Sequence, residues 1–198
     1  LNGAEFSIPA DRIEAGTYLI AAAITGGDVT ISNVQAPRMN NILDKLKLSG
    51  ASINIGDDYI QLIMKEDFIL PVDISTAPFP GFPTDMQAQF TVLNALSKGS
   101  SVVTENVFEN RFMHVQELNR MGCDITVKGS NAFIKGVDCL NGAPVMATDL
   151  RASASLILAG LCAKGETIVD RIYHIDRGYE RIEEKLSYLG ADITRLPH

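Results

Sequence analysis

One aspartate and three arginines are the side chains best suited to chemistry in this 198-residue sequence. The aspartate is Asp85, and the arginines are Arg111, Arg151 and Arg177. An arginine guanidinium is always charged, and its planar fork of N–H donors matches the two oxygens of a carboxylate or a phosphate. Arginines that converge on one place therefore indicate a site for a small molecule that carries such groups.

The composition excludes several other kinds of protein. The formal net charge is −7 and the pI is about 4.9, with no basic stripe, which argues against nucleic-acid binding as the main role. No apolar run approaches the roughly 20 residues that cross a bilayer, and residues 1–6 lack the pattern of a secretory signal. Because the chain starts at Leu1 rather than at Met, we expect a piece of a longer protein. The absence of paired cysteine motifs fits a reducing, cytoplasmic location.

No pattern in the sequence points to a metal or an organic cofactor, so we expect none. Metal-ligand spacings, glycine-rich phosphate loops and a GxSxG elbow are all missing from the sequence. The cysteines at 123, 139 and 162 are interpreted as small buried hydrophobic residues, Cys162 above all. His114 lies at helical spacing and is expected to be structural.

The elements that must position these side chains follow from a threefold internal repeat. Each copy has an apolar helical segment that ends in glycine, a β-branched strand, and a second, amphipathic helix that also ends in glycine. The glycine steps agree: 99 − 27 = 72, 122 − 50 = 72, 165 − 99 = 66 and 190 − 122 = 68. The expected elements, copy by copy, are helical segments 18–27, 90–99 and 156–165, first strands 29–31, 102–104 and 167–169, and later strands 52–55, 124–127 and 192–194.

The repeat predicts one domain over residues 1–198. Its three β-α-β-α-β-β units cover about 5–72, 73–144 and 145–198, and the third stops before its last strands. The first helix of each unit is apolar nearly all round, which is typical of a buried helix. Three buried helices with outer sheets give an α/β (α+β) fold with pseudo-threefold symmetry, unlike a doubly wound sheet.

Two of the four candidate site residues occupy equivalent positions in the repeat. Asp85 lies 14 residues before Gly99, and Arg151 lies 14 residues before Gly165. The corresponding position of the first copy holds Ile13, so neither polar side chain is demanded by the shared core. We therefore expect Asp85 and Arg151 at matching starts of neighbouring buried helices.

The other two arginines are related by the same step of 66 residues. Arg111 and Arg177 are expected near the starts of the second helices, where the first copy has Met39. Threefold symmetry gathers these helix starts at one end of the domain, where unpaired N–H groups suit anions. A simpler interpretation makes Asp85 and Asp149 helix caps, and the arginines solvated. Arginine at a helix start opposes the macrodipole, however, which favours a compensating anion.

Four segments resemble the UDP-N-acetylglucosamine 1-carboxyvinyltransferase family of enolpyruvyl transferases. They are 82–89 (FPTDMQAQ), 106–112 (NVFENRF), 148–152 (TDLRA) and 176–180 (DRGYE), and they occur in this order. The resemblance covers the whole chain and places it in the family's C-terminal half, with 11–17 (DRIEAGT) near the start of that half. It implies two similar helix-cored domains, of the kind called an inside-out barrel, with the active site between them.

The resemblance also implies a reaction and its partners. Enolpyruvyl passes from phosphoenolpyruvate to the 3-hydroxyl of UDP-N-acetylglucosamine with release of phosphate, the first committed step of peptidoglycan synthesis. The expected partners are these two small molecules and the missing N-terminal domain of the parent chain, with no nucleic acid and no membrane. The family's Lys-Asn pair and its mobile Cys- or Asp-bearing loop belong to the absent half, so the isolated piece is expected to be inactive.

Three residues of this sequence match family positions that meet the nucleotide sugar or the reacting carbons. Asp85 corresponds to the carboxylate that holds the sugar 3-hydroxyl and takes its proton, as a general base does. Val107 corresponds to a position whose backbone contacts the nucleotide sugar. Asp149 corresponds to an acid near the reacting carbons.

The three arginines match family positions that bind phosphoenolpyruvate. Arg111 and Arg151 correspond to the pair that grips its carboxylate, and Arg177 corresponds to the group that meets its phosphate. A tetrahedral intermediate that carries both charges needs such convergent cations. Two alternatives remain open: a non-catalytic repeat module that binds anions, and a shikimate-type enolpyruvyl transferase.

Overall fold

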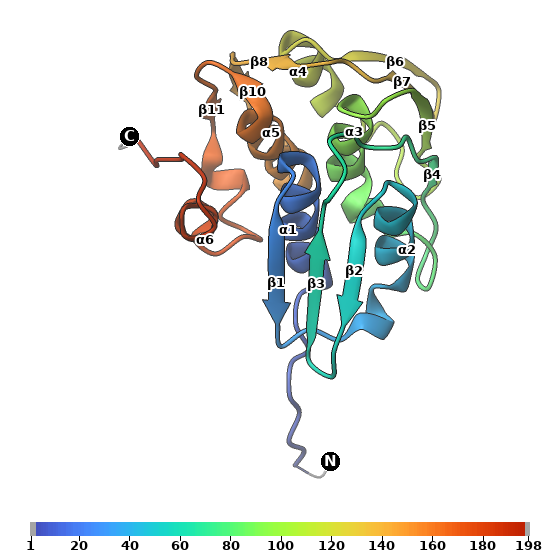
Figure 1. Cartoon of the computed structure of the whole chain (residues 1–198), viewed down its shortest axis with the longest axis vertical. Coiled ribbons are helices and arrows are strands. Elements are labelled where there is room, and N and C mark those ends of the chain that lie inside the picture. The colour runs from blue at the N-terminus through green and yellow to red at the C-terminus, as the bar shows by residue number, and fades with distance from the viewer. Residues whose placement is uncertain (1–2, 197–198) are drawn as a thin grey trace.

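Three mutually packed helices form the centre of the computed structural model, which describes residues 3–196 (Figure 1). They are α1 (Arg12–Thr25), α3 (Gln87–Ala95) and α5 (Leu150–Cys162), and each contacts the other two. Every residue of α3 is buried. A helix that is apolar around its whole circumference has to be covered on all sides, which confirms the prediction of a buried helical core.

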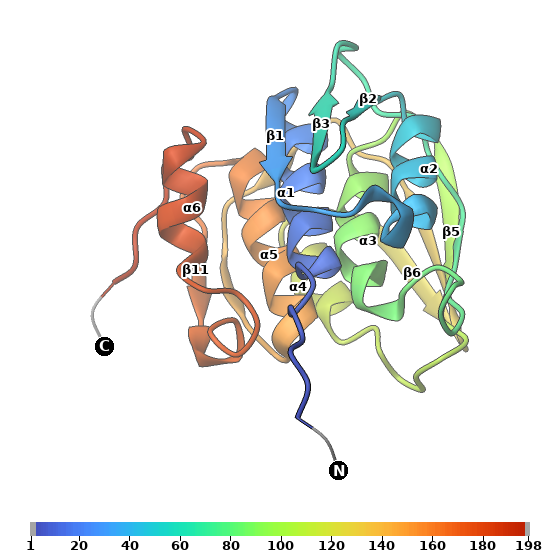
Figure 2. The same ribbon diagram turned by 90° about the horizontal axis from the view of Figure 1, so that it is seen from below.

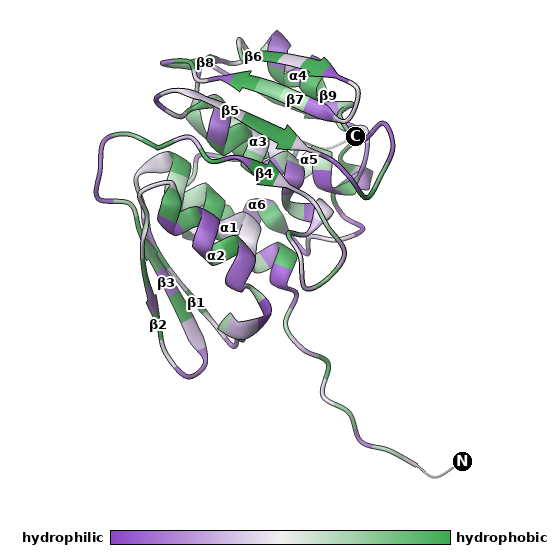
Figure 3. Cartoon of the chain, turned by 90° about the vertical axis from the view of Figure 1, so that its right-hand side faces the viewer, coloured by the Kyte–Doolittle hydropathy of each residue, from purple (hydrophilic) through white to green (hydrophobic). Residues whose placement is uncertain are grey.

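Two sheets, in which most strand pairs are antiparallel, cover this core on two sides, as Figure 3 shows. In the first sheet, Ile60 and Leu62 of the central strand are buried while alternate residues face outward, as the period of a half-buried strand requires. The first sheet has the order β1 (Asp28–Ser32), β3 (Tyr59–Ile63), β2 (Ser52–Ile55), and the second has the order β4 (Ile74–Ser75), β5 (Ser100–Thr104), β7 (Asn131–Lys135), β6 (Asp124–Lys128).

The third unit has only short parallel pairs of strands: β8 (Leu140–Asn141) with β10 (Ala163–Lys164), and β9 (Pro144–Met146) with β11 (Ile168–Asp170). The pair β9–β11 matches the parallel pair β4–β5 of the second unit. The strand predicted at 192–194 is wrong, because those residues form no strand. Its counterparts β2 and β6 pair with the strand that follows each of them, and only four residues follow Thr194.

The second helix of each unit lies outside the core: α2 (Asn40–Leu48), α4 (His114–Arg120) and α6 (Ile182–Tyr188). Figure 2 shows α2 and α6 on opposite sides of the central three helices. After each second helix a glycine has a positive φ, 105° at Gly50, 98° at Gly122 and 100° at Gly190, which side chains rarely adopt. These turns confirm the predicted glycine stops of the second helices, whereas α3 and α5 end at Ala95 and Cys162, before the glycines at 99 and 165.

The predicted unit order β-α-β-α-β-β is complete in the second unit, from β4 to β7. In the first unit, residues 3–11 form no strand and extend away from the helices (Figure 1). The predicted domain limits at residue 1 and at residue 198 lie outside the described residues. The α/β fold with buried helices and outer sheets is confirmed. None of the helices in residues 3–196 has the length and hydropathy that a bilayer crossing needs.

Candidate functional site

Asp85 and two of the predicted arginines meet at one end of the helical core. Asp85 lies in the short 3-10 helix η2 (Thr84–Met86) directly before α3, Arg151 lies in the first turn of α5, and Arg111 precedes α4. Arg111 Nη2 donates a hydrogen bond of 2.7 Å to Asp85 Oδ1, and Arg151 Nε lies 3.9 Å from Asp85 Oδ2. The repeat predicted that these helix starts gather at one end of the core, and there the Asp85 carboxylate lies between the guanidinium groups of Arg111 and Arg151.

Arg111 is held from two further directions. Its Nη1 donates a 2.7 Å hydrogen bond to Thr84 Oγ1, and its guanidinium carbon lies 4.9 Å from the centre of the Phe108 ring. A cation over an aromatic face is attracted by the ring quadrupole. The guanidinium thus has a fixed orientation in which both of its terminal nitrogens are used.

Arg151 is more deeply buried and less completely bonded. Its side chain is 12% exposed, and its guanidinium carbon lies 5.2 Å from the centre of the Tyr179 ring. Its Nη2 is 3.8 Å from Asp11 Oδ2, while Nε and Nη1 have no hydrogen-bond partner among the described residues. Unsatisfied buried donors are costly, so an incoming carboxylate or phosphate would find a cation in need of acceptors.

The capping interpretation is correct for Asp149. Its Oδ1 accepts from the backbone N–H groups of Arg151 at 2.8 Å and of Ala152 at 2.9 Å, which caps α5. Asp11 caps α1 in the same way. Asp149 Oδ2 accepts no hydrogen bond within residues 3–196, so half of this carboxylate remains available.

The capping interpretation is wrong for Asp85. Neither η2 nor α3 has a side-chain cap, and the hydrogen bond and ion pair of Asp85 go to arginines. Its side chain is 41% exposed, so a substrate group can reach it. A carboxylate that is held by arginines and is also open to solvent suits chemistry better than helix capping.

Arg177 does not join this cluster. It is exposed, and no hydrogen bond or ion pair within residues 3–196 links it to Asp85, Arg111 or Arg151. The second helices follow steps of 68 residues rather than 66, so Tyr179 (179 − 111 = 68) takes the place corresponding to Arg111. Tyr179 faces Arg151 as Arg111 faces Asp85, and the predicted equivalence of Arg111 with Arg177 is therefore shifted by two residues.

Tyr179 also closes a polar contact between the core helices. Its hydroxyl lies 2.9 Å from Thr17 Oγ1 and accepts from Gln89 Nε2 at 3.3 Å. Thr17 and Gln89 are equivalent in the repeat, since both lie ten residues before the helix-ending glycine (27 − 17 and 99 − 89). The segment that holds Arg177 is thereby fixed to the site end of the core.

Val107 is exposed and belongs to a loop that a buried glutamate holds. The backbone N–H groups of Val107 and Phe108 donate to Glu105 Oε1 at 2.9 and 3.0 Å, and Glu105 is 3% exposed. Nothing in the sequence marks Glu105 except its place directly after an apolar strand, which is a weak signal. The N–H of Val107 is therefore in use, whereas its carbonyl accepts no hydrogen bond from residues 3–196 and can meet a ligand.

The histidine and the cysteines considered in the sequence have structural rather than chemical surroundings. Both ring nitrogens of His114 are buried without a hydrogen-bond partner among residues 3–196, and burial lowers the pKa of the ring from 6.5 to about 4, so the ring is neutral near pH 7. All three cysteines are free. Cys123 rather than Cys162 is the fully buried one, and burial raises the pKa of both thiols to about 12. No cluster of metal-ligating side chains occurs within residues 3–196.

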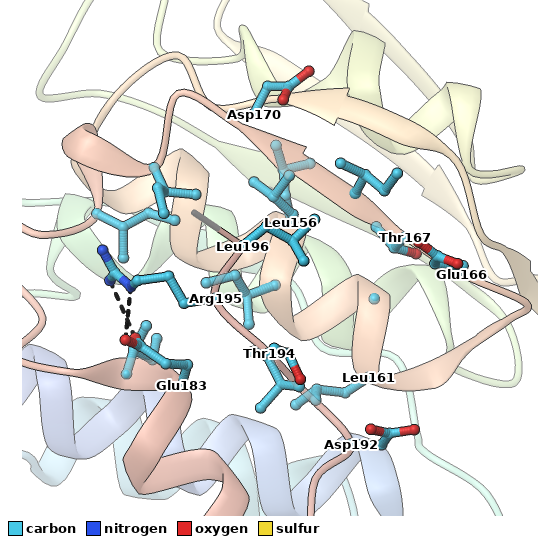
Figure 4. A pocket seen from close by; sticks show the side chains of 18 of the residues that line it. Leu156, Leu161, Glu166, Thr167, Asp170, Glu183, Asp192, Thr194, Arg195 and Leu196 are labelled. Carbon is cyan, nitrogen blue, oxygen red and sulfur yellow. Dashed lines mark hydrogen bonds and ion pairs between the residues drawn. The ribbon is translucent and has the colours of Figure 1, made fainter. Parts of the chain in front are cut away.

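Two hollows lie near the core. One has a volume of about 290 Å³ and is lined by Arg12, Arg38 and Phe79, among others. Its lining extends to Pro83, two residues before Asp85 in the sequence. A larger groove of about 740 Å³ lies between α5, β11 and residues 192–196 (Figure 4) and contains none of the predicted site residues. In the first two units, strand β3 packs on α1 and strand β7 packs on α3. The described residues of the third unit include no strand equivalent to β3 or β7, and the groove lies beside α5 where such a strand would pack.

Comparisons with known proteins agree with this architecture. The family model described as EPSP synthase (3-phosphoshikimate 1-carboxyvinyltransferase) matches residues 1–186. UDP-N-acetylglucosamine 1-carboxyvinyltransferases from two strains of Coxiella burnetii, Dugway 5J108-111 and RSA 331 / Henzerling II, are each 60% identical over 196 residues. That match covers 99% of this chain and 45% of each relative, so the chain spans less than half of their length.

Solved structures show the same fold. The enolpyruvyl transferase NikO from Streptomyces tendae superposes with a TM-score of 0.87 at 28% identity, over 94% of this chain and 44% of that one. The EPSP synthase from Acinetobacter baumannii superposes with a TM-score of 0.75 at 18% identity, over 96% of this chain and 44% of that one. The second likeness is evidence for the fold alone.

Proposed function

We propose that this chain, which belongs to the EPSP synthase (3-phosphoshikimate 1-carboxyvinyltransferase) family of enolpyruvyl transferases, is one half of a UDP-N-acetylglucosamine 1-carboxyvinyltransferase. The observation that carries the proposal is the cluster of Asp85 between Arg111 and Arg151 at one end of the helical core. The 60% identity to the Coxiella enzymes favours the nucleotide sugar over shikimate 3-phosphate as acceptor.

The proposed parent enzyme transfers enolpyruvyl from phosphoenolpyruvate to the 3-hydroxyl of UDP-N-acetylglucosamine in the cytoplasm, as the first committed step of peptidoglycan synthesis. Residues 1–198 would form its C-terminal domain, and the N-terminal domain would supply the remaining substrate contacts. In this view the chain alone carries part of an active site and binds both substrates weakly.

The chemistry assigns Asp85 the role of general base. As the sugar 3-oxygen bonds to C2 of the enol, its proton passes to the Asp85 carboxylate, while a general acid of the complete active site gives a proton to C3, which becomes a methyl group. The resulting tetrahedral carbon carries a carboxylate and a phosphate. Its C2–O bond to phosphate then breaks with both electrons leaving on phosphate, and C3 returns its proton to the conjugate base of that general acid, which forms the enol ether of the product. A base at the substrate hydroxyl contributes about 10²–10⁴-fold to such a step.

The arginines balance the negative charge of the tetrahedral intermediate. Arg151 has unpartnered donors in the free chain and is suited to the substrate carboxylate, with Arg111 beside it. Arg177 is exposed and is assigned to the phosphate. Asp149 caps α5 with Oδ1 and offers Oδ2 near the reacting carbons, and the Val107 carbonyl is assigned to the nucleotide sugar.

The test needs a complete enzyme, so the matching segment of the Coxiella relative is replaced with this chain. Phosphate release is measured with phosphoenolpyruvate and either UDP-N-acetylglucosamine or shikimate 3-phosphate. We expect turnover with the nucleotide sugar only, its loss in Asp85→Ala and Arg151→Ala with folding intact, and none from the isolated chain. Full activity of both variants would leave only an anion-binding module, and turnover by the isolated chain would disprove the division into halves.

A further inference from the structure

A buried acid lies behind the candidate site, where no substrate is expected to touch it. Glu105 directly follows β5 and is 3% exposed. Its carboxylate accepts four hydrogen bonds: from Thr84 Oγ1 at 2.7 Å to Oε2, and from Thr76 Oγ1 at 2.8 Å, Val107 N at 2.9 Å and Phe108 N at 3.0 Å to Oε1. Burying a carboxylate is costly without such partners, so the arrangement needs an explanation.

The repeat itself does not demand this acid. Residues 33, 105 and 171 each directly follow a strand that comes after the core helix of their unit, β1, β5 or β11. The first and third units have Asn33 and Arg171 there, and both are exposed. Among these three equivalent positions, a buried carboxylate occurs only in the unit that carries Asp85, which points to the site rather than to the shared core.

The direction of the hydrogen bonds connects Glu105 to Arg111. Arg111 has only donors, so its Nη1 must donate to Thr84 Oγ1, and the single hydroxyl hydrogen of Thr84 then goes to Glu105. Both hydrogen bonds in the series from Arg111 through Thr84 to Glu105 point toward the carboxylate, and bonds aligned in this way strengthen one another. Because the guanidinium is planar, fixing Nη1 also fixes Nη2, which donates to Asp85.

The same carboxylate holds the loop on the other side of the arginine. It accepts from the N–H groups of Val107 and Phe108, and the Phe108 ring lies 4.9 Å from the Arg111 guanidinium carbon. Thr76 donates to Glu105 and accepts from Asn106 N at 2.8 Å. One buried charge therefore connects the cluster around Asp85 with the loop assigned to the nucleotide sugar.

We propose that Glu105 is a positioning residue: through Thr84 it orients Arg111, and thereby Asp85, while it seats the loop of residues 106–108. Its effect on turnover rests on the proposed function. The link from Glu105 to Arg111 is a property of the chain and can be measured without any substrate.

Two substitutions test the link. Glu105→Gln keeps the size of the side chain, and its amide oxygen still accepts from the loop N–H groups, but its NH₂ group then faces Thr84. Thr84 receives donors from both sides, and its bond to Arg111 weakens. Thr84→Val removes the hydroxyl that connects the two groups and leaves Glu105 in place. Glu66→Gln is the matched control, because Glu66 is exposed and distant in sequence.

The first measurement uses the chain alone and follows hydrogen exchange of the Arg111 guanidinium by NMR, assigned by its loss in Arg111→Lys. We expect exchange at least tenfold faster in Glu105→Gln and in Thr84→Val, and unchanged in Glu66→Gln. Unchanged exchange in a folded Glu105→Gln would overturn the proposal. If Glu105→Gln does not fold, unchanged exchange in Thr84→Val overturns it instead.

The second measurement uses the chimeric enzyme and separates kcat from KM. We expect kcat to fall about tenfold to a hundredfold in either variant, because one charge-assisted hydrogen bond to Arg111 is lost. The KM for UDP-N-acetylglucosamine should stay within about twofold, since the loop bonds persist, and the double variant should be no slower than the slower single one. Additive losses, or unchanged kcat in Glu105→Gln, would overturn the positioning role. An inactive unsubstituted chimera refutes the proposed function, and the exchange measurement then decides the link on its own.

Discussion

Asp149 is expected to have two separable roles, one in stability and one in catalysis. Its Oδ1 caps α5 through bonds of 2.8 and 2.9 Å to backbone N–H groups, and its Oδ2 is free within residues 3–196. Asparagine keeps an oxygen that can cap the helix but has no carboxylate, whereas alanine has neither. Comparing Asp149→Asn with Asp149→Ala therefore separates the cap from the charge.

The size of the stability effect follows from the cap. Loss of an N-cap side chain costs about 1 kcal/mol, within a range of roughly 0.5–2 kcal/mol. For a chain of this size, about 1 kcal/mol lowers the Tm by roughly 2–4 °C. We expect this loss in Asp149→Ala and a change of no more than a few tenths of a kcal/mol in Asp149→Asn, measured by urea and thermal unfolding followed by circular dichroism.

Asp11 provides the matched control, because it caps α1 with the same two-bond geometry and has no assigned role at the reacting carbons. Asp11→Ala and Asp11→Asn should repeat the two stability results. In the chimeric enzyme, Asp149→Asn should lose at least tenfold in kcat although it is stable. Equal destabilisation by asparagine and alanine would refute the cap, and a fully active Asp149→Asn would refute the catalytic role.

Three further outcomes follow from the contacts of single residues. Tyr179→Phe removes the hydroxyl shared with Thr17 and Gln89 and should cost about 1–3 kcal/mol in urea unfolding, since buried polar groups lose a partner. His114 stays neutral in the fold, with a pKa of about 4 against 6.5, whereas the unfolded chain binds the proton. As the pH falls from 6.5 to 4, protonation of this group in the unfolded chain should lower the free energy of unfolding by up to about 1.4 kcal/mol per pH unit. In His114→Leu, the free energy of unfolding should depend less on pH by that amount. Among the thiols, Cys139 should react first with a thiol reagent at pH 8, because burial raises the pKa of the other two to about 12.

Local patterns predicted the elements that hold the site. Apolar helical patterns identified α1, α3 and α5, although the expected segments 90–99 and 156–165 run past the observed helix ends at Ala95 and Cys162. The repeat then placed Asp85 and Arg151 on neighbouring helices, and their side chains are 3.9 Å apart. Equivalence within a repeat therefore provided spatial information that no single segment contains.

The remaining features depend on loops that the repeat does not constrain. Tyr179 faces Arg151 because the third unit has two extra residues before its second helix, a change that shifts the expected place of Arg177. The buried Glu105 depends on donors from three separate segments. The strand expected at 192–194 fails because a strand needs a partner, and pattern alone does not supply one.

The most direct test of the central claim is the kcat of Asp85→Asn in the chimeric enzyme with UDP-N-acetylglucosamine and phosphoenolpyruvate. Asparagine keeps the shape and one oxygen for the 2.7 Å bond from Arg111, so the fold and the arginine cluster should persist. We predict a loss of about 10²–10⁴-fold in kcat, because the amide cannot take the proton of the sugar hydroxyl. A folded Asp85→Asn enzyme within about threefold of the unsubstituted kcat would contradict the assignment of Asp85 as the base.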